Sequence, residues 1–361
     1  MRRLRVPRKP GQVAVLAEPS APVDAASRVG ARTLTRIAAE AGVSVSTVSK
    51  VLNGRTDVAP ATRERIGLLL RRQGYQPGSK LGVGAVDLLI PGIAERSPWV
   101  EQLIHGATEA AAEAGYSIVV STVSSASEFH RWLELATVRG TYGVLTILQL
   151  PRGAERQQLA AAGIPVVAID PAEEPGPDIR SVGATNWQGG LTATRHLIGL
   201  GHRRIAAVAG PASLWSSQAR LDGYRAAMFE AGLAVDDRLI RPDWFTVERG
   251  RHQAAHLLSL TDRPTAVVAG NDAQAFGVLQ ALRDLGLRSP EDLSVVGFDD
   301  VPFAAWAAPP LTTVRQPLAA MAATAFRMLR PSGSGAAEAH HVELATTLVI
   351  RDSTAPPPAS A

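Results

Sequence analysis

The sequence contains no cysteine, which excludes disulfide scaffolds, zinc ribbons, iron–sulfur clusters and catalytic thiols together. Long apolar runs are missing as well. The stretch 143–148 is strand-sized and far short of the roughly 18 residues that a membrane helix needs. The apolar stretch 13–17, after the basic N-terminus, is too short for the core of a signal peptide. We therefore expect a cytoplasmic protein that has no membrane partner.

Lysine is scarce, with three residues in the chain, and none of them follows a glycine. This excludes the Gly-Lys of a phosphate-binding P-loop. No histidine precedes a glutamate, so the metalloprotease helix motif is absent, and the pair His252 and His256 lacks an evident third ligand for a metal. Asp299 and Asp300 are adjacent on a predicted extended segment and point to opposite sides, unlike the facing carboxylates of a glycosidase. We expect neither catalytic residues nor a bound metal or cofactor.

Basic charge is concentrated at the N-terminal end of the chain. Residues 1–80 hold 15 Lys and Arg against 5 Asp and Glu, so this segment carries +10 while the rest carries −6. A basic segment on an acidic body is typical of a protein in which one part meets a polyanion. Residues 1–31 show no periodicity, and we expect them to be a disordered basic tail.

Three short helices are predicted after this tail. The capping-type residues Thr33 and Ser44 precede the apolar-periodic stretches 34–41 and 45–52, and Pro60 opens a third helical stretch. Three helices in about 42 residues form a small all-α bundle.

The spacing within 37–52 is that of two helices that cross at a tight turn. Ala38 is small where the helices would touch, and Gly42 permits the turn. In helix-turn-helix proteins the N-terminal part of the second helix enters the major groove of DNA. A helical hairpin that serves packing alone is the alternative, and the basic charge of the segment argues against it. The exposed face of the second helix is predicted to carry Val45, Ser46, Ser49 and Lys50.

The pattern changes after residue 77. A linker rich in Gly and Pro, 78–85, is followed by short apolar runs that alternate with helical patterns. This alternation predicts parallel sheets covered by helices, and its length favours two α/β lobes over one. We expect a helix-turn-helix head at 32–77, a two-lobed body at 86–354 and a disordered tail at 355–361. The predicted strands are 86–90, 118–120, 143–147, 166–169, 205–209, 266–269 and 295–298.

Motifs along most of the chain carry a family resemblance. The head contains SVSTVSKVLNG at 44–54, and the body contains GHRRI, RLDGY, VVGFDD and PLTTVRQP, at 201–205, 220–224, 295–300 and 310–317. Over residues 33–353 the chain resembles the LacI/GalR family of bacterial repressors. The resemblance implies a homodimer with two heads on double-stranded operator DNA, and a body like a periplasmic binding protein that holds a sugar between its lobes. The predicted DNA-binding residues are Ser44, Val45, Ser46, Thr47, Ser49, Lys50, Asn53, Arg55 and Tyr75.

The segment after Tyr75 departs from the family pattern. Family members follow the Tyr-x-Pro of the head with a hinge helix whose leucine wedges into the minor groove of DNA. Here the segment 78–84 is shorter and lacks that signature, and the candidate wedge, Leu81, lies too close to Tyr75. Operator bending and a hinge-based switch are therefore in question.

Polar residues end several predicted strands of the body, among them Asp170, Asn271 and Asp299. In parallel α/β lobes, ligands lie beyond the carboxyl ends of the strands. Carboxylates and amides suit sugar hydroxyls, and tryptophan rings cover the C–H faces of a sugar. Helix capping by Asp272 and Asp300 and core packing of the tryptophans are the structural alternatives.

The family resemblance implies further ligand contacts. It gives Arg220 the role of binding ligand oxygens, unless this side chain merely pairs with a carboxylate, and it makes Trp187 and the pair Trp244 and Phe245 aromatic walls. Trp99 falls in the first loop of the cleft. The predicted ligand-binding residues are Trp99, Asp170, Trp187, Arg220, Trp244, Asn271 and Asp299.

These patterns favour a transcriptional regulator, most simply a repressor, whose operator affinity is controlled by a sugar. The segments 183–187 and 342–346 are similar to regulators of xylose or xyloside use, so xylose or a xylo-oligosaccharide is one expected effector. A cytoplasmic sugar-binding or sugar-processing protein with a vestigial head is the alternative, which the missing hinge signature supports. A third possibility keeps DNA binding and replaces the sugar by a protein co-effector.

Overall fold

The computed structural model describes residues 31–52, 57–72, 84–94, 97–329 and 340–358. The chain divides into two compact units, 1–78 and 79–361. The predicted linker begins at this boundary, and its residues 78–83 lie outside the described part, as do residues 1–30 of the predicted tail. Both predictions extend too far, because residues 84–85 of the predicted linker already belong to a strand and Ala31 of the predicted tail belongs to a helix. No helix of the described part is both long and apolar enough to cross a membrane.

The first unit contains three helices, which are α1 (Ala31–Ala41), α2 (Val45–Leu52) and α3 (Pro60–Arg72). The predicted cap at Thr33 is wrong, because α1 already begins at Ala31 and Thr33 is helical. Alanine has the highest helix propensity, which suits Ala31 to the start of this additional turn. Ser44 does cap α2, since its Oγ accepts a hydrogen bond from the Thr47 amide at 3.2 Å.

A tight turn at Gly42 brings α1 and α2 together. Gly42 has a φ of +64°, which glycine adopts without steric cost, and the Val43 amide donates to the Ala38 carbonyl at 2.9 Å. The chain thereby reverses so that the apolar faces of the three helices meet. The buried side chains of this small core include Leu34, Ile37, Val48, Val51, Ile66 and Leu70.

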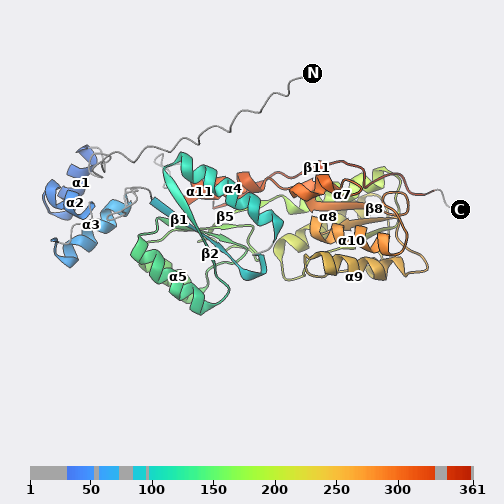
Figure 1. Cartoon of the computed structure of the whole chain (residues 1–361), viewed down its shortest axis with the longest axis horizontal. Helices are drawn as coiled ribbons and strands as arrows, with labels where there is room; N and C mark the ends of the chain where they lie inside the picture. Colours follow the sequence, from blue (N-terminus) through green and yellow to red (C-terminus); the bar gives the residue numbers. More distant parts are fainter. Residues whose placement is uncertain (1–30, 53–56, 73–83, 95–96, 330–339, 359–361) are drawn as a thin grey trace, which may run out of the picture. The chain divides into compact units, whose positions relative to one another are not determined.

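The second unit begins with a lobe built on a six-stranded parallel sheet of the order β10-β5-β4-β3-β1-β2. Helices α4 (Pro98–Glu113) and α11 (Leu318–Leu329) lie side by side on one face of this sheet, and α5 (Ala126–Arg139) and α6 (Gly153–Ala161) cover the other (Figure 1). The strands are β1 (Gly84–Ile90), β2 (Tyr116–Thr122), β3 (Gly143–Ile147), β4 (Val166–Ile169), β5 (Arg180–Ala184) and β10 (His341–Leu344).

The second lobe is a five-stranded sheet of the order β11-β9-β8-β7-β6. One face packs against α7 (Asn186–Gly199) and α8 (Trp215–Glu230), and the other against α9 (Val247–Leu258) and α10 (Asp272–Asp284). The strands are β6 (Ile205–Val208), β7 (Ala266–Ala269), β8 (Ser294–Asp299), β9 (Thr312–Arg315) and β11 (Thr347–Val349), and the short 3-10 helices of the body are Gly92–Ala94, Asp237–Leu239 and Pro302–Trp306.

All seven strands predicted from the sequence are present, and they run parallel to their neighbours. Four strands were missed, namely β5, β9, β10 and β11, and β11 runs antiparallel to β9 against the expectation of purely parallel sheets. The chain crosses between the lobes after β5, after β9 and after β10. Each lobe is therefore completed by strands from distant parts of the sequence.

The C-terminal end is better ordered than expected. Ala355 donates its amide to Ser294 Oγ at 3.0 Å, and its carbonyl accepts from His202 Nε2 at 2.9 Å. The predicted disordered tail at 355–361 is therefore wrong at its start, because these contacts tie Ala355 to the second lobe.

Reciprocal glycines bring the helices of the second lobe into close contact. Gly223 of α8 faces the Trp187 carbonyl of α7, and Gly190 of α7 faces the Arg220 carbonyl of α8. A Cβ at either glycine would collide with backbone. Because glycine at these positions fixes the distance between α7 and α8, it also fixes the backbone of Arg220, whose side chain enters the site described below.

We expect Gly223→Ala to lower the free energy of unfolding of the body by about 1–3 kcal/mol, because the added methyl group overpacks a rigid backbone contact. Urea denaturation followed by circular dichroism measures this change. Gly199→Ala is the matched control in α7, where an added Cβ meets no atom within 4 Å, and it should leave stability unchanged or raise it. Equal effects of the two substitutions would contradict the packing role.

Candidate functional site

The predicted recognition helix, α2, presents its polar side chains outward. Val45 is exposed at 41%, Ser46 and Lys50 are exposed, and Ser49 is half-buried, while Val48 is buried. Ser44 Oγ lies 2.8 Å from Ser46 Oγ and 2.9 Å from Thr47 Oγ1, so three hydroxyls gather at the N-terminus of α2. Such a terminus offers hydroxyls and backbone amides to a phosphate or a base edge.

Lys50 makes an ion pair that the sequence did not predict. Its Nζ lies 2.8 Å from Asp57 Oδ2, and both side chains are more than half exposed. An exposed pair of this kind contributes little to stability, so a DNA phosphate or guanine can compete for the ammonium group. Three other predicted DNA-binding residues, Asn53, Arg55 and Tyr75, lie outside the described residues, as does the candidate wedge Leu81.

A cleft of about 450 Å³ in the body is lined by residues of both lobes. Its volume lies in the range typical of small-molecule sites. The structure brings six of the seven predicted ligand-binding residues to this cleft, together with Phe245. The six are Trp99, Asp170, Arg220, Trp244, Asn271 and Asp299.

Trp187 is placed elsewhere. It follows Asn186 at the start of α7 and lines a neighbouring cavity of about 320 Å³ with Trp215 and His341. The expectation that Trp187 forms a wall of the cleft is therefore wrong for this structure. Trp187 lies in the first turn of α7, among the residues that line this neighbouring cavity.

Arg220 is the central polar group of the cleft. Its Nε donates to Asn186 Oδ1 at 2.8 Å, and its Nη1 donates to the Gly270 carbonyl at 2.6 Å. The guanidinium carbon lies 3.8 Å from the centre of the Phe298 ring, and Nη1 lies 3.7 Å from Asp299 Oδ1. The buried charge is thus held by an amide, a carbonyl, a ring and a carboxylate, as burial of an ion requires.

The carboxylates of the cleft stand on strained backbone. Asp170 follows β4 with a φ of +47°, and Asp299 ends β8 with a φ of +114°. Such conformations are rare for residues other than glycine and concentrate at functional sites. They place two buried carboxyl groups at the carboxyl ends of strands from different lobes, where both interact electrostatically with Arg220.

Sequence reasoning missed Gln316. Its Nε2 donates to Asp299 Oδ1 at 2.7 Å, while its buried Oε1 has no hydrogen-bond partner among the described atoms. Gln316 directly follows β9. Because β9 was not predicted as a strand, the expectation that polar residues at strand ends line a ligand site did not identify Gln316. An unpaired acceptor that lines the cleft can receive a hydrogen bond from a ligand hydroxyl.

Helix capping was expected as an alternative for Asp272 and Asp300, but the residue that caps α10 is Asn271. Its Oδ1 accepts from the Gln274 amide at 2.8 Å, and the residue also lines the cleft. Asp272 is fully buried and accepts hydrogen bonds from Thr313 Oγ1 and the Val301 amide instead of capping the helix.

Burial governs the protonation of the acidic groups. Desolvation raises the pKa of Asp299 to about 6, although Arg220 and Gln316 act in the opposite direction. Desolvation also raises the pKa of Asp170, against the effect of Arg220. The buried Arg220 in turn has a lowered pKa because burial disfavours its charge. Several carboxyl groups surround the single guanidinium of Arg220. A ligand that donates hydrogen bonds to these carboxyl groups stabilises their ionised form.

Comparisons with known proteins agree with this architecture. Residues 33–78 match the family model of bacterial regulatory proteins, lacI family, and residues 194–354 match that of a periplasmic binding protein-like domain. The HTH-type transcriptional regulator CelR of Thermobifida fusca is 35% identical over 333 residues, which cover 89% of this chain and 98% of the relative. The chain belongs to the LacI family. The predicted family and fold class are confirmed, and this LacI-family chain is a DNA-binding transcriptional regulator.

Solved structures of LacI-family proteins extend the comparison. A CelR–cellobiose complex matches with a TM-score of 0.68 and 34% identity, over 89% of this chain and 99% of that chain. The lac repressor dimer bound to operator and the anti-inducer ONPF matches with a TM-score of 0.66 and 26% identity, over 89% of this chain and 98% of that chain.

The raised pKa of Asp299 predicts a pH dependence of the ligand-free LacI-family protein. Because folding favours the protonated carboxyl, the contribution of Asp299 to stability is complete below about pH 4 and is lost as the pH rises through about 6. The free energy of unfolding of the wild type relative to Asp299→Asn should therefore fall between pH 4.5 and pH 7.5, as measured by urea denaturation. Asp222→Asn, which removes an exposed carboxylate of α8, is the control. If the difference in unfolding free energy between the wild type and Asp299→Asn stayed constant over this pH range, the raised pKa of Asp299 would be refuted.

Proposed function

We propose that this regulator binds a sugar in the cleft between its lobes and that the sugar changes its affinity for operator DNA. One observation carries the proposal: Asp170, Arg220, Asn271 and Asp299 converge on a single cleft that also has aromatic walls. Carboxylate and amide oxygens accept hydrogen bonds from hydroxyls, a guanidinium donates to ring and hydroxyl oxygens, and aromatic faces cover C–H surfaces. The CelR relative whose structure contains cellobiose supports the same ligand class.

The head supplies the DNA-binding half of the proposal. The exposed face of α2 carries a methyl-bearing side chain and several hydroxyls, with one ammonium group, that of Lys50, in its last turn, and these groups suit base edges and phosphates in a major groove. The lac repressor in the comparison is a dimer on its operator, and we propose that this chain also acts as a homodimeric repressor. As an operator-binding regulator it would act in the cytoplasm, and we include this location in the proposal.

The identity of the sugar is a separate question. The segments 183–187 and 342–346, which suggest a xylose or xyloside regulator, contribute to the neighbouring Trp187 cavity and do not line the main cleft. The cleft therefore favours none of xylose, xylobiose and cellobiose as the effector, and all three are tested. The alternative of a sugar-processing protein with a vestigial head has no support among the relatives described above, which are regulators, and we infer that the chain is not an enzyme.

The recognition helix predicts a specific effect of Lys50→Ala. If Lys50 leaves Asp57 to contact a guanine, its loss should cost about 1–3 kcal/mol of operator binding and leave binding to scrambled duplex nearly unchanged. Fluorescence anisotropy at fixed salt, on labelled duplex from upstream of its own and neighbouring operons, measures both affinities. An equal loss on both duplexes would show that Lys50 contacts a phosphate and does not read sequence.

The aromatic wall predicts the effect of Trp244→Ala. This ring is 46% exposed, so its removal should spare the fold and weaken sugar binding by about 3–10-fold. Isothermal titration calorimetry with xylose, xylobiose, glucose and cellobiose measures the change. Trp306→Ala is the matched control, because Trp306 is 75% exposed and does not line the cleft. Sugar affinity that is insensitive to Trp244→Ala would argue against a sugar in this cleft.

A further inference from the structure

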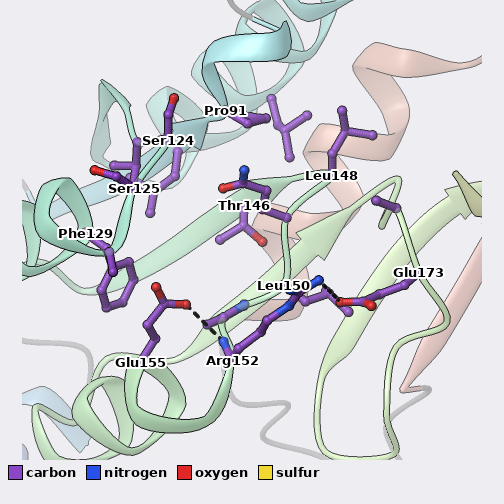
Figure 2. Close-up of a pocket in the computed structure, with 17 residues that line it drawn as sticks. Pro91, Ser124, Ser125, Phe129, Thr146, Leu148, Leu150, Arg152, Glu155 and Glu173 are labelled. Atoms are coloured by element: carbon purple, nitrogen blue, oxygen red, sulfur yellow. Dashed lines mark hydrogen bonds and ion pairs between the residues drawn. The ribbon is translucent and has the colours of Figure 1, made fainter. Parts of the chain in front are cut away.

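A second cavity, of about 270 Å³, lies in the first lobe beside the sugar cleft (Figure 2). Its walls come from the segments that follow β1, β2 and β3, at the carboxyl edge of the sheet. Figure 2 shows Ser124 and Ser125 on one side and Arg152 and Glu173 on the other, with Thr146 between them. The two cavities share Leu148, Gln149 and Ala172 as lining residues.

The topology of the sheet makes this edge a place for a ligand. Strand β1 lies between β2 and β3, and the helix that follows β1 covers the opposite face from α5 and α6, which follow β2 and β3. The connections after β1 and β3 therefore leave the sheet in opposite directions. A crevice opens outside the carboxyl ends of strands at such a switch point.

Thr146 indicates that the cavity receives a polar group. The residue is 6% exposed, and its Oγ1 has no hydrogen-bond partner among the described atoms, although it lines the cavity. An unpaired buried hydroxyl is unfavourable, and a ligand that bonds to it would remove that cost.

The charges around the cavity argue against an anionic ligand. The Ser124 amide, just before α5, donates to Glu128 Oε2 at 2.7 Å, and the Arg152 amide, just before α6, donates to Glu155 Oε2 at 3.0 Å. Arg152 also pairs with Glu173 at 3.0 Å, as the dashed lines of Figure 2 show. The positive ends of both helices thus already face carboxylates. The groups that remain available to a ligand are hydroxyls, the exposed Gln149 side chain and the Phe129 ring. These groups suit a neutral, hydroxylated ligand.

The wall between the two cavities is held in a strained conformation. Leu148 has a φ of +61°, which is unfavourable for a leucine. Two backbone hydrogen bonds hold it there, from the Leu148 amide to the Ile169 carbonyl at 3.1 Å and from the Ala172 amide to the Leu148 carbonyl at 2.8 Å. This conformation keeps Leu148 at the junction of the cavities, where its side chain lines both.

We propose that this second cavity binds a neutral, sugar-like group next to the sugar of the cleft, an inference that rests on the proposed function. The group is either the second ring of an oligosaccharide whose first ring occupies the cleft or a separate monosaccharide. A volume of about 270 Å³ is slightly below the range of pockets for drug-sized ligands, which fits a single ring.

Two substitutions address the cavity without touching the main cleft. Ala126→Phe fills it from the exposed first turn of α5, and Thr146→Val removes the unpaired hydroxyl while keeping the shape of the side chain. Ala160→Phe is the matched control, since Ala160 is exposed on α6 and does not line the cavity. Trp244→Ala reports on the main cleft in parallel.

The experiment is calorimetric titration of the full chain and these variants with xylose, xylobiose, xylotriose, glucose, cellobiose and cellotriose. A bridging oligosaccharide should bind one per chain and more tightly than its monosaccharide, and Ala126→Phe should abolish that advantage while Thr146→Val weakens binding about five-fold. A separate monosaccharide should bind two per chain, with one of the two events lost in Ala126→Phe. In both cases Ala160→Phe should behave as the wild type.

Two other results would contradict the inference, and they differ in what they mean for the proposed function. If Trp244→Ala weakens sugar binding but Ala126→Phe and Thr146→Val bind every sugar as the wild type does, the second cavity takes no ligand and the proposed function stands. If the wild type binds none of the six sugars, both the proposed function and this inference are overturned for these ligand classes.

Discussion

The body depends on the burial of one positive charge, the guanidinium of Arg220. A buried ion is tolerated only where hydrogen bonds and opposite charge replace its water, and Asn186, Gly270, Phe298 and Asp299 supply these from three separate segments of the second lobe. The close contact between α7 and α8 fixes the backbone that carries the guanidinium. The same group lines the cleft, so the contacts that tie these three segments together also position a hydrogen-bond donor for the proposed ligand.

The cleft joins two lobes that the chain enters repeatedly. Asp170 and Trp99 belong to the first lobe, whereas Arg220, Asn271 and Asp299 belong to the second. A ligand that contacts both sets favours whichever arrangement of the lobes brings them together. A ligand can shift operator affinity only by such a differential preference between states, and linkage requires operator DNA to change the affinity for the ligand by the same factor.

Much of this architecture could be predicted from the sequence, and the failures have physical causes. Asp170 and Asp299 were found because parallel strands deliver their terminal residues to one edge. Arg220 came from family resemblance alone, since nothing in a helical pattern marks a buried arginine. Gln316 was missed because β9, with the sequence Thr-Thr-Val-Arg, has no apolar run by which a strand could be predicted. Trp187 was expected in a loop as a wall of the cleft, but it belongs to the first turn of α7 and lines the neighbouring cavity, a direction that the sequence pattern does not encode.

The most direct test of the account is the coupling between the two binding activities. Anisotropy titrations of the full chain on its operator duplex, at one salt concentration, would be made with and without a saturating sugar, and sugar affinity would be measured with and without operator. The account predicts that operator affinity changes by at least about five-fold and that sugar affinity changes by the same factor. Tight binding of both ligands without any mutual effect would contradict it.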